Sequence, residues 1–505
     1  MQAVDVFGQI ESAKRMGTPL IAVSTSDQQA FVDACDTHLN GSPRVGWDII
    51  RGWRPLNEAG EGAIESVEVE QYEPEQAIAD AEKFPSGTIA VIANAHKYFS
   101  NAAVIQAVQN IRNPFKATKR LMIFTGVDFQ LPPELQSDVV LLEEPLPTTE
   151  QLGAILADTY KAFSGAVQDR FNRKLKALTK DALAQATEAI KGLPAFLAEQ
   201  VVSMSLDADD GLDIEKLWQH KAATINQDPA LDFSYKRTPP GEGLLRGLSQ
   251  IRKFLERIFA GKEPPALIVI CDEFEKAMAG GMSDHTGDGG VSKDANYTLL
   301  TAIEDNGWHM LLLNGPPGTG KTKLANESGE LFGVPVIKLD INATKGGIVG
   351  TSEANIRKVM KTILSVGSNR VLFIATTNKQ AVLSPEIRRR CRRGIWYIDL
   401  LSAEERAEVW PVYEKKYNLT KKQAAKRPND EGWTGAEIRN CCDFAYQLDC
   451  SLVEAAEFIV PVAKTDAKAI DEIRSIAKNT FLSANYPGPY RGPAKAKGKR
   501  SFDVS

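Results

Sequence analysis

The sequence predicts an α/β protein with two parallel β-sheets, each followed by a mainly helical part. Short apolar runs rich in β-branched residues alternate with helical patterns in both halves of the chain. A glycine-rich loop joins one of these runs to a helix at residues 315–322. The predicted strands lie at 19–29 (running into a loop), 88–95, 119–127 and 138–143, and again at 266–271, 309–313, 334–339 and 371–376.

The length and spacing of the patterns divide the 505 residues into six parts. Proline, glycine and charge mark a linker, and three prolines, three glycines and five basic residues predict a disordered tail. The predicted parts are an α/β domain at 1–147, a helical domain at 148–225, the linker at 226–244, a second α/β core at 245–400, its helical lid at 401–483 and the tail at 484–505.

Composition excludes several classes of protein. A hydrophobic fraction of 43% excludes collagen and wholesale disorder, and 60 Lys+Arg against 65 Asp+Glu excludes a polycation that coats nucleic acid. The six cysteines form no CxxC pair, so they are expected to be free thiols in a reducing compartment. No apolar run approaches a membrane span of about 20 residues, and the start of the chain lacks a signal-peptide pattern. The expected location is cytosolic, without a membrane partner.

The loop GPPGTGKT matches G-x-x-x-x-G-K-[ST] between a predicted strand and a predicted helix. Its glycines allow backbone N–H groups to surround phosphate oxygens, and the helix N-terminus adds positive potential. We expect Lys321 to reach the β- and γ-phosphates and Thr322 to bind Mg²⁺. The sequence therefore predicts ATP and Mg²⁺ as ligands, with a binding loop made of Gly315, Pro316, Pro317, Gly318, Thr319, Gly320, Lys321 and Thr322.

Such a loop needs a partner strand that ends in carboxylates, one for the Mg²⁺ shell and one to activate water. Downstream of the loop the next buried strand ends in Asn378, and Asp471 with Glu472 lies in a charged helical stretch. The good match is upstream, in ALIVICDEFEKA. Asp272 is therefore the expected metal ligand and Glu273 the expected general base.

Several motifs together resemble the AAA+ ATPases over about residues 245–465: GPPGTGKT, KGGIVGTSEANIRKVM, VLFIATTN, LSPEIRRRCRRGIWYIDL and GWTGAEIRNCC. The resemblance implies a P-loop NTPase sheet with a helical lid. It also implies that Asn378 positions the attacking water and that Arg389 and Arg392 are arginine fingers. Gly435 and Ala436 would flank the adenine.

The motif order differs from the usual one in this family, because the strand that carries Asp272 and Glu273 precedes the phosphate loop. We interpret this as a rearrangement similar to a circular permutation. Lys345 to Ile348 stand where unfoldases carry an aromatic pore residue. The run Arg388–Arg393, interrupted by Cys391, leaves the choice of finger open, and a plain basic surface is the alternative.

The first half resembles the degenerate first module of a bacterial, plastid and phage family with two AAA-like units. VSTSDQQAF stands in the place of the phosphate loop without glycine or lysine, and Asn94, Ala95 and His96 stand where acids are expected. The resemblance implies a scaffold or recruiting module.

Three further features have a functional and a plainer interpretation. His285 with Asp284 and Asp288 indicates either a metal site or, more simply, a loop. Trp47 and Trp53 indicate either a partner anchor or core packing. Four of the five basic residues of the tail indicate either phosphate contacts or a solvated end: Lys495, Lys497, Lys499 and Arg500.

The function that the resemblance implies is ATP hydrolysis in a homo-oligomeric ring, with a hexamer as the family expectation. Hydrolysis would move the lid and remodel a macromolecular partner, protein rather than DNA. Two alternatives remain at this point: an ATP-dependent assembly or switch protein with little turnover, and a DNA-transaction motor of a phage or mobile element.

Overall fold

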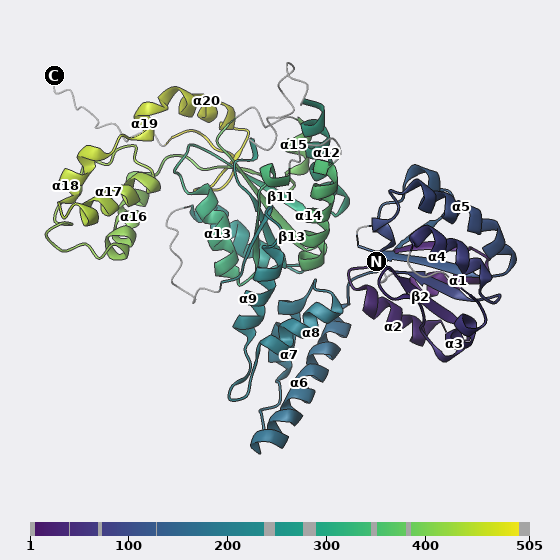
Figure 1. Ribbon diagram of the computed structural model, residues 1–505. Helices are drawn as coiled ribbons and strands as arrows, with labels where there is room; N and C mark the ends of the chain where they lie inside the picture. The colour runs from purple at the N-terminus through teal and green to yellow at the C-terminus, as the bar shows by residue number, and fades with distance from the viewer. Residues whose placement is uncertain are drawn as a thin grey trace, which may run out of the picture. The chain divides into compact units, whose positions relative to one another are not determined.

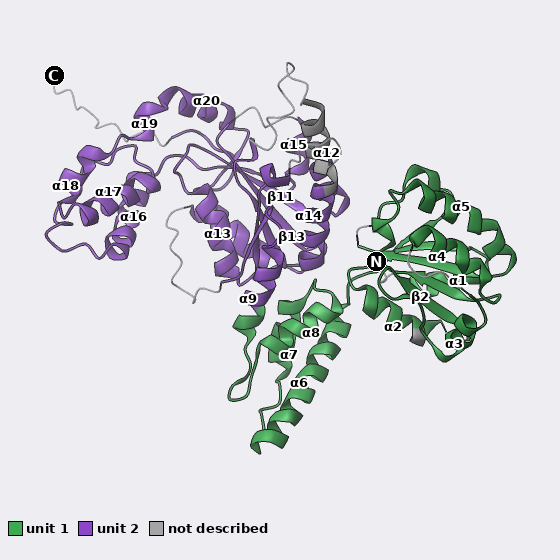
Figure 2. Ribbon diagram, viewed as in Figure 1, with its two compact units in different colours: residues 1–217 green, residues 218–505 purple. Residues whose placement is uncertain are grey.

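The structure is a computed structural model that describes residues 6–39, 41–68, 73–127, 129–236, 248–275, 289–344, 351–379 and 385–493. The chain divides into two compact units, residues 1–217 and 218–505 (Figure 2). The boundary falls inside helix α9 (Ile214–Ile225) and not in the predicted linker at 226–244.

Unit 1 begins with a six-stranded sheet in the order β3-β2-β4-β5-β1-β6, in which only the β2–β3 pair is antiparallel. The strands are β1 (Leu20–Ser24), β2 (Arg44–Asp48), β3 (Gly52–Pro55), β4 (Ile89–Ile92), β5 (Leu121–Gly126) and β6 (Val140–Glu143). The helices that accompany this sheet are α1 (Val6–Arg15), α2 (Gln28–His38), α3 (Glu58–Glu65), α4 (Pro74–Asp80) and α5 (Ala102–Ala117).

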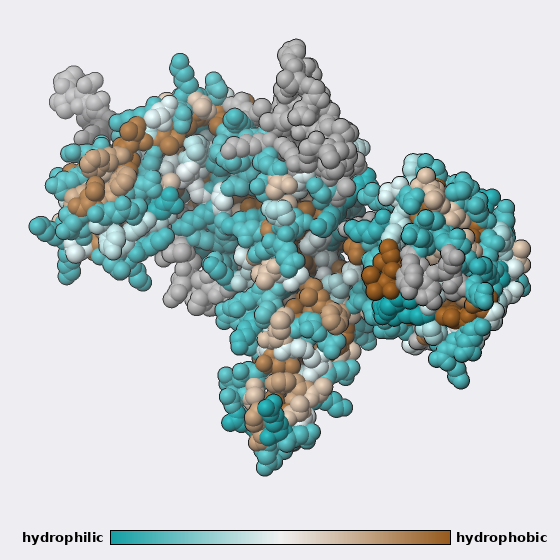
Figure 3. Space-filling view, in the orientation of Figure 1, coloured by the Kyte–Doolittle hydropathy of each residue, from teal (hydrophilic) through white to brown (hydrophobic). Residues whose placement is uncertain are grey.

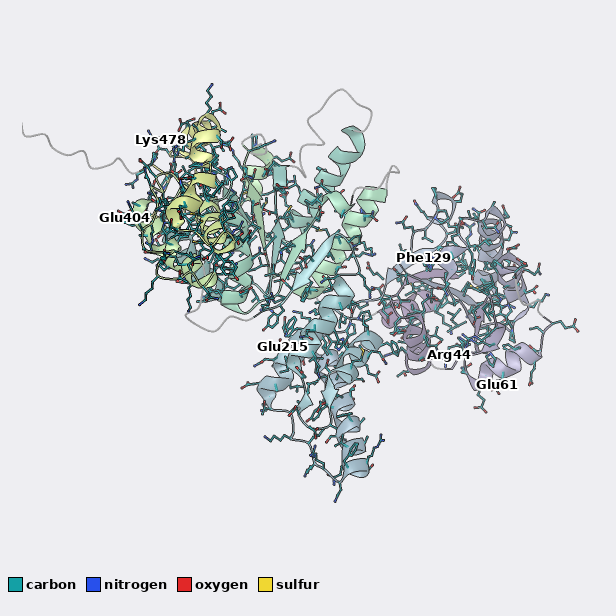
Figure 4. All side chains as sticks on the ribbon, turned by 60° about the vertical axis from the view of Figure 1, so that its left-hand side comes forward. Arg44, Glu61, Phe129, Glu215, Glu404 and Lys478 are labelled. Carbon is teal, nitrogen blue, oxygen red and sulfur yellow. The ribbon has the colours of Figure 1, made fainter. Side chains whose placement is uncertain are left out.

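Helices cover both faces of this sheet. Successive side chains of a strand point to opposite faces, and accordingly Ile21 belongs to a core cluster with α1 and α2 whereas Ala22 belongs to one with α3, α4 and α5. Trp47 and Trp53 are buried at 1% and 5% exposure, so they are core residues and not a surface anchor. Arg44 and Phe129 of this unit are labelled in Figure 4.

The second part of unit 1 is helical. It contains α6 (Thr149–Phe171), α7 (Lys180–Ile190), α8 (Ala195–Met204) and the short hairpin of β7 (Leu206–Asp207) with β8 (Gly211–Leu212), followed by α9. Thr148 and Gln151 form a capping box that fixes the start of α6. This stretch matches the helical pattern predicted from the sequence.

Unit 2 contains a seven-stranded sheet in the order β15-β14-β11-β13-β10-β12-β9, in which only the β12–β9 pair is antiparallel. The strands are β9 (Leu231–Ser234), β10 (Leu267–Cys271), β11 (His309–Asn314), β12 (Val336–Leu339), β13 (Val371–Thr377), β14 (Ile395–Tyr397) and β15 (Leu482–Ser483). Every residue of β13 is buried, as expected for a central strand covered on both faces.

Helices α10 (Ser249–Phe259) and α13 (Lys321–Phe332) contribute to the core cluster on one face of this sheet. Helices α12 (Gly289–Asp305) and α14 (Thr351–Gly367) lie on the other face (Figure 1). The short α15 (Pro385–Arg390) packs against α12. The resulting architecture is the α/β fold of an AAA+ P-loop NTPase.

A separate helical lid follows the sheet. It contains α16 (Ala403–Lys416), α17 (Gly435–Gln447), α18 (Leu452–Ala455), α19 (Val462–Thr465) and α20 (Ala467–Ala477). Trp410 and Trp433 pack with Cys441 and Cys442 in its core. Figure 4 labels Glu404 in the first turn of α16, and Figure 3 shows apolar side chains over the region of α18.

Two predictions about irregular segments are wrong in part. Residues 231–234 of the predicted linker form β9, because Leu231 and Phe233 alternate with polar residues and are buried against the sheet. Residues 484–493 of the predicted tail are ordered: Ala484 N donates to Tyr397 O over 3.1 Å, and the Tyr490 hydroxyl donates to Asp399. Composition alone does not reveal these contacts. Residues 494–505 lie outside the described part of the chain.

In the described part of the chain, no helix combines the length and the apolar character that crossing a membrane requires.

Candidate nucleotide site

The glycine-rich loop lies between the end of β11 and the start of α13, at the centre of the sheet of unit 2. Gly315 approaches β14 so closely that a Cβ atom on it would lie 2.1 Å from the Ile398 carbonyl oxygen. Gly318 has φ +77°, a conformation that favours glycine, and a Cβ there would lie 2.8 Å from Thr434 Oγ1 of the lid. Both glycines are therefore required by local geometry.

Lys321 is the first residue of α13 and is 6% exposed. Its Nζ donates to the carbonyl oxygens of Gly315 at 2.9 Å and Pro316 at 2.7 Å. Burial lowers the pKa of Lys321 to about 8, while the nearby Glu275 and Asp272 carboxylates act in the opposite direction. In this structure the lysine is thus folded back onto its own loop.

Asp272 lies directly after β10, and its carboxylate contacts Thr322 on α13. Thr322 Oγ1 lies 2.8 Å from Asp272 Oδ1 and 3.0 Å from Oδ2. Thr376 Oγ1, near the end of β13, also donates to Asp272 Oδ1. A hydroxyl and a carboxylate suit Mg²⁺, which commonly takes one or two protein oxygens and fills its remaining positions with water and phosphate. The residues present therefore fit this ion.

Glu273 has φ +50°, which is unusual for a residue with a side chain. Its backbone N–H donates to Thr376 Oγ1 over 3.3 Å. The Asn378 backbone N–H donates to Glu275 Oε1 over 3.4 Å. Asn378 Oδ1 and Glu275 Oε2 are buried without a hydrogen-bond partner among the described residues, so this end of the site holds unsatisfied polar atoms.

One cavity of about 340 Å³ brings most of these groups together. Its polar lining includes Asp272, Glu273, Lys321, Thr322 and Asn378. Its more apolar lining consists of Leu248, Leu401, Val409, Val412 and Tyr413. The predicted residues Pro317, Gly318, Thr319, Gly320, Gly435 and Ala436 also line the cavity. A lining that combines charged groups with apolar and aromatic side chains suits a ligand with phosphates and a flat base.

Sequence reasoning missed the four apolar residues Leu248, Leu401, Val409 and Val412 at this cavity, and also four residues with polar groups, namely Thr376, Lys323, Tyr413 and Arg439. Lys323 Nζ on α13 lies 3.1 Å from the Tyr413 hydroxyl on α16, and also 5.1 Å from the centre of its ring. Arg439 follows Gly435 by four residues on α17, so helix periodicity places both on one face and is the signal that finds it.

The predicted arginine fingers lie elsewhere. Neither Arg389 nor Arg392 lines the nucleotide cavity; both line a separate cavity of about 290 Å³ with Arg390, Glu304, Ile303 and Trp308. Arg389 is 72% exposed and Arg390 only 7%. The structure therefore does not bring these arginines to the site of their own chain.

Several predicted features lie outside the described residues. These are the pore segment at Lys345 to Ile348, the loop that contains Asp284, His285 and Asp288, and the basic residues Lys495, Lys497, Lys499 and Arg500.

Comparison with known proteins agrees with this architecture. Residues 8–144 match the family model for the N-terminal domain of SpoVK-like AAA ATPases. Residues 311–367 match the model for the ATPase family associated with various cellular activities (AAA). The chain thus has an AAA domain preceded by a SpoVK-like N-terminal module. The second match begins in β11, after Asp272 and Glu273, so it does not include the acidic pair.

Three relatives illustrate the similarity. The uncharacterized AAA domain-containing protein ycf46 of Trieres chinensis is 22% identical over 484 residues, which cover 83% of this chain and 84% of the relative. The ycf46 protein of Guillardia theta is 20% identical over 520 residues, which cover 91% of this chain and 92% of the relative. Cell division control protein 48 homolog C of Arabidopsis thaliana is 47% identical, but only over 49 residues, which are 10% of this chain and 6% of the relative.

Proposed function

We propose that this chain is a ring-forming AAA+ ATPase that binds ATP and Mg²⁺ in the cavity between sheet and lid of unit 2. We propose further that it couples hydrolysis to the remodelling of a macromolecular partner, protein rather than DNA. The observation that carries the proposal is the hydrogen bond between Thr322 and Asp272, in the cavity that also contains Lys321, Glu273 and Asn378.

Each residue has a task that its position supports. Lys321 leaves its own loop and binds the β- and γ-phosphates, together with backbone N–H groups of the loop. Thr322 and Asp272 hold Mg²⁺, which when bound withdraws charge from the phosphate oxygens. Glu273 accepts a proton from the attacking water at its carboxylate, and the Asn378 amide orients that water.

The arginines act between chains in this proposal. Arg389 and Arg392 are exposed on the chain that carries them and do not line its own nucleotide cavity. An arginine supplied by a neighbouring subunit contributes roughly 10³–10⁵ in rate, so hydrolysis would depend on assembly. The proposed assembly is a homo-oligomeric ring, with six subunits as the family expectation.

The proposal includes a rearranged order of the ATPase segments. The acidic pair follows β10, which precedes the phosphate loop in the chain but lies between β13 and β12 in the sheet. Its support is that a site depends on the positions of side chains and not on their order along the chain. We also propose that unit 1 does not bind nucleotide and serves as a scaffold or recruiting module.

None of the six cysteines, all of which lie in the described part of the chain, forms a disulfide. Free thiols are typical of a reducing compartment, which supports the proposed cytosolic location.

The first test replaces Glu273 with Gln and measures ATP turnover of the purified oligomer. We expect turnover to fall by about 10²–10⁴-fold while ATP binding is kept, because the amide fills the same space but takes no proton. Glu215→Gln, an exposed change on α9, is the matched control and should leave turnover unchanged. Wild-type turnover in Glu273→Gln would contradict the assignment of the base.

The alternative of a nucleotide-dependent switch is equally compatible with the position of Lys321. Lys321 donates to Gly315 and Pro316 of its own loop, so ATP binding requires this loop to rearrange whether or not hydrolysis follows. The same preparation separates the two functions. If ATP drives assembly of the wild-type chain but phosphate release is absent, the switch is the function.

A further inference from the structure

The arginine-rich segment that ends α15 divides into residues with different environments. Arg390 is 7% exposed, whereas its neighbour Arg389 is 72% exposed. Arg392 is also exposed. Two adjacent arginines of the same run therefore have opposite relations to solvent, which the sequence alone does not distinguish.

A single carboxylate on α12 contacts both arginines. Glu304 Oε2 lies 3.0 Å from Arg390 Nη2, and Glu304 Oε1 lies 3.7 Å from Arg389 Nη2. Arg390 has a second carboxylate partner, because its Nη1 lies 3.2 Å from Glu386 Oε1, one turn earlier on α15. Glu304 thus ties the last turn of α15 to the end of α12.

The two ion pairs differ in how much their loss destabilises the fold. A buried charge that loses its partner is strongly destabilising, so Arg390 cannot easily leave Glu304. An exposed pair at 3.7 Å contributes little, so Arg389 can exchange Glu304 for another anion at small cost. Arg389 also borders a cavity of about 290 Å³ that Ile303 and Trp308 line, so its side chain is not packed on all sides.

The surroundings of this pair are fixed by the backbone. Arg393 N donates to Met310 O of β11 over 3.0 Å, so the segment after α15 is held on the sheet. Trp308 is 2% exposed and its Nε1 donates to Ser368 O over 3.3 Å. The anchor formed by Glu304 and Arg390 therefore has a rigid base.

We propose that Glu304 is a positioning residue for hydrolysis in a neighbouring subunit. It immobilises Arg390, fixes the orientation of α15 and leaves Arg389 as the arginine presented to the neighbour's ATP. In a separate subunit Glu304 also holds the Arg389 guanidinium until the γ-phosphate replaces it. This inference rests on the proposed function, since it requires an arginine that acts between chains.

Charge reversal tests the anchor. In the assembled oligomer, we expect Arg390→Glu and Glu304→Arg each to lower kcat by about tenfold or more, without a comparable change in ATP affinity, because the nucleotide cavity is untouched. The double variant R390E with E304R restores the pair in reverse and should recover most of the lost kcat. R389E with E304R is the matched control and should not recover, since the partner of Arg389 is a phosphate.

Conservative variants keep the test informative if the reversed chains fail to fold or assemble. Arg390→Lys keeps a charge for Glu304 and should retain more kcat than Arg390→Ala. Arg389→Lys should lose nearly as much as Arg389→Ala, because a lysine does not reproduce the guanidinium contact. The reverse ranking would overturn the proposal, as would a folded, assembled double variant without recovery.

The proposed function and this inference fail in different ways. If Arg389→Ala in the assembled oligomer keeps wild-type turnover, the action of Arg389 between chains is wrong. If Arg389→Ala loses turnover but Arg390→Ala and Glu304→Gln both keep it, catalysis between chains remains and the role of Glu304 is wrong.

Discussion

Unit 1 and unit 2 contain sheets with the same spatial order of five parallel strands. In unit 1 the order is β2-β4-β5-β1-β6, and in unit 2 it is β12-β10-β13-β11-β14. An antiparallel strand pairs with the first strand of each order, β3 with β2 in unit 1 and β9 with β12 in unit 2. The order of these strands along the chain differs between the two units. The two units therefore share a spatial arrangement of strands and differ in the residues at the carboxyl ends of those strands.

The two units differ first in the loop that follows β1 in unit 1 and β11 in unit 2. Ser24, the last residue of β1, pairs with Gly126 of β5 in unit 1. Asn314, the last residue of β11, pairs with Thr377 of β13 in unit 2, so the two residues occupy corresponding positions. Residues 25–27 then separate Ser24 from the first residue of α2, whereas residues 315–320 separate Asn314 from the first residue of α13. The loop of unit 1 is thus three residues shorter, and it lacks the glycines and the lysine of GPPGTGKT.

The side chains at this edge differ in charge. In unit 2, Thr322, Asp272 and Thr376 form one hydrogen-bonded group. In unit 1, Gln28 takes the corresponding place: its Oε1 accepts from the Thr125 hydroxyl at 2.8 Å and from the Asn94 backbone N–H at 2.9 Å. Its Nε2 donates to Asn94 Oδ1 at 2.8 Å. Neutral groups thus satisfy one another where unit 2 has charges available to a ligand.

The largest expected effect comes from giving unit 2 the residue of unit 1. Asn94 and Glu273 both follow their strands in the left-handed region, with φ of +53° and +50°. Glu273→Asn should lower ATP turnover by about 10²–10⁴-fold. It should not lower the melting temperature, because Asn tolerates this backbone conformation better than Glu. A phosphate-release assay and calorimetry on the same sample check both statements, and retained turnover would contradict the comparison.

The next effect concerns phosphate binding. Lys321→Ala should weaken ATP binding by about 10–100-fold, since it removes a charge-assisted contact. Gln28→Ala, at the corresponding place in unit 1, should leave ATP affinity unchanged. Titration with a fluorescent ATP analogue measures both variants. Weaker binding in Gln28→Ala would show that unit 1 also contributes to nucleotide binding.

The third prediction is a loss of stability in unit 1 that does not extend to unit 2. Gln28→Ala should destabilise unit 1 by about 0.5–1.5 kcal/mol, because the N–H of Asn94 loses its protein acceptor and the Thr125 hydroxyl keeps only the longer bond to Ile92 O at 3.3 Å. Amide hydrogen exchange of peptides from β4 and β5 reads this locally, and peptides from β10 and β13 serve as the internal control. Unchanged exchange in β4 and β5 would contradict the role assigned to Gln28.

The smallest effect depends on pH. Burial raises the pKa of Glu144 in unit 1, although a hydrogen bond with Thr25 acts in the opposite direction. The folded state therefore binds more protons than the unfolded state above the ordinary carboxyl range, and stability falls as pH rises through that window. Glu144→Gln should remove this slope and slightly stabilise unit 1 at neutral pH. Urea unfolding at pH 5 and pH 7 tests the difference.

Much of unit 2 could be predicted from the sequence because its signals are local. The run LIVIC followed by Asp272, and the spacing of Gly315, Gly320 and Lys321, are patterns within a few residues. The cavity residues Thr376 and Tyr413 were not predicted, since each becomes relevant only through a strand neighbour or a helix from a distant part of the chain.

Contacts between residues that are distant in the sequence explain why other features could not be predicted. The arginine run is uniform in sequence, and only the folded structure shows that Arg390 is buried beside Glu304 of α12 whereas Arg389 is exposed. The segment after residue 483 reads as polar and proline-rich, yet Tyr490 is 3% exposed and meets Asp399. No periodicity within either segment carries this information.

The ordered segment after β15 lies beside the start of α10, at the other end of the same part of the chain. Ala484 O accepts from the backbone N–H groups of Gln250 and Ile251 at 3.0 and 3.1 Å, and Ser249 Oγ donates to Asn485 O at 3.0 Å. Residues 249–251 and 484–485 are therefore adjacent, although they lie far apart in the sequence. Joining them and opening the chain at another turn would keep the pairing among strands β10 to β15. A chain closed between residues 248 and 485 and opened at the exposed turn of Gly307 would begin with β11, would leave β9 out, and would place Asp272 and Glu273 after the lid.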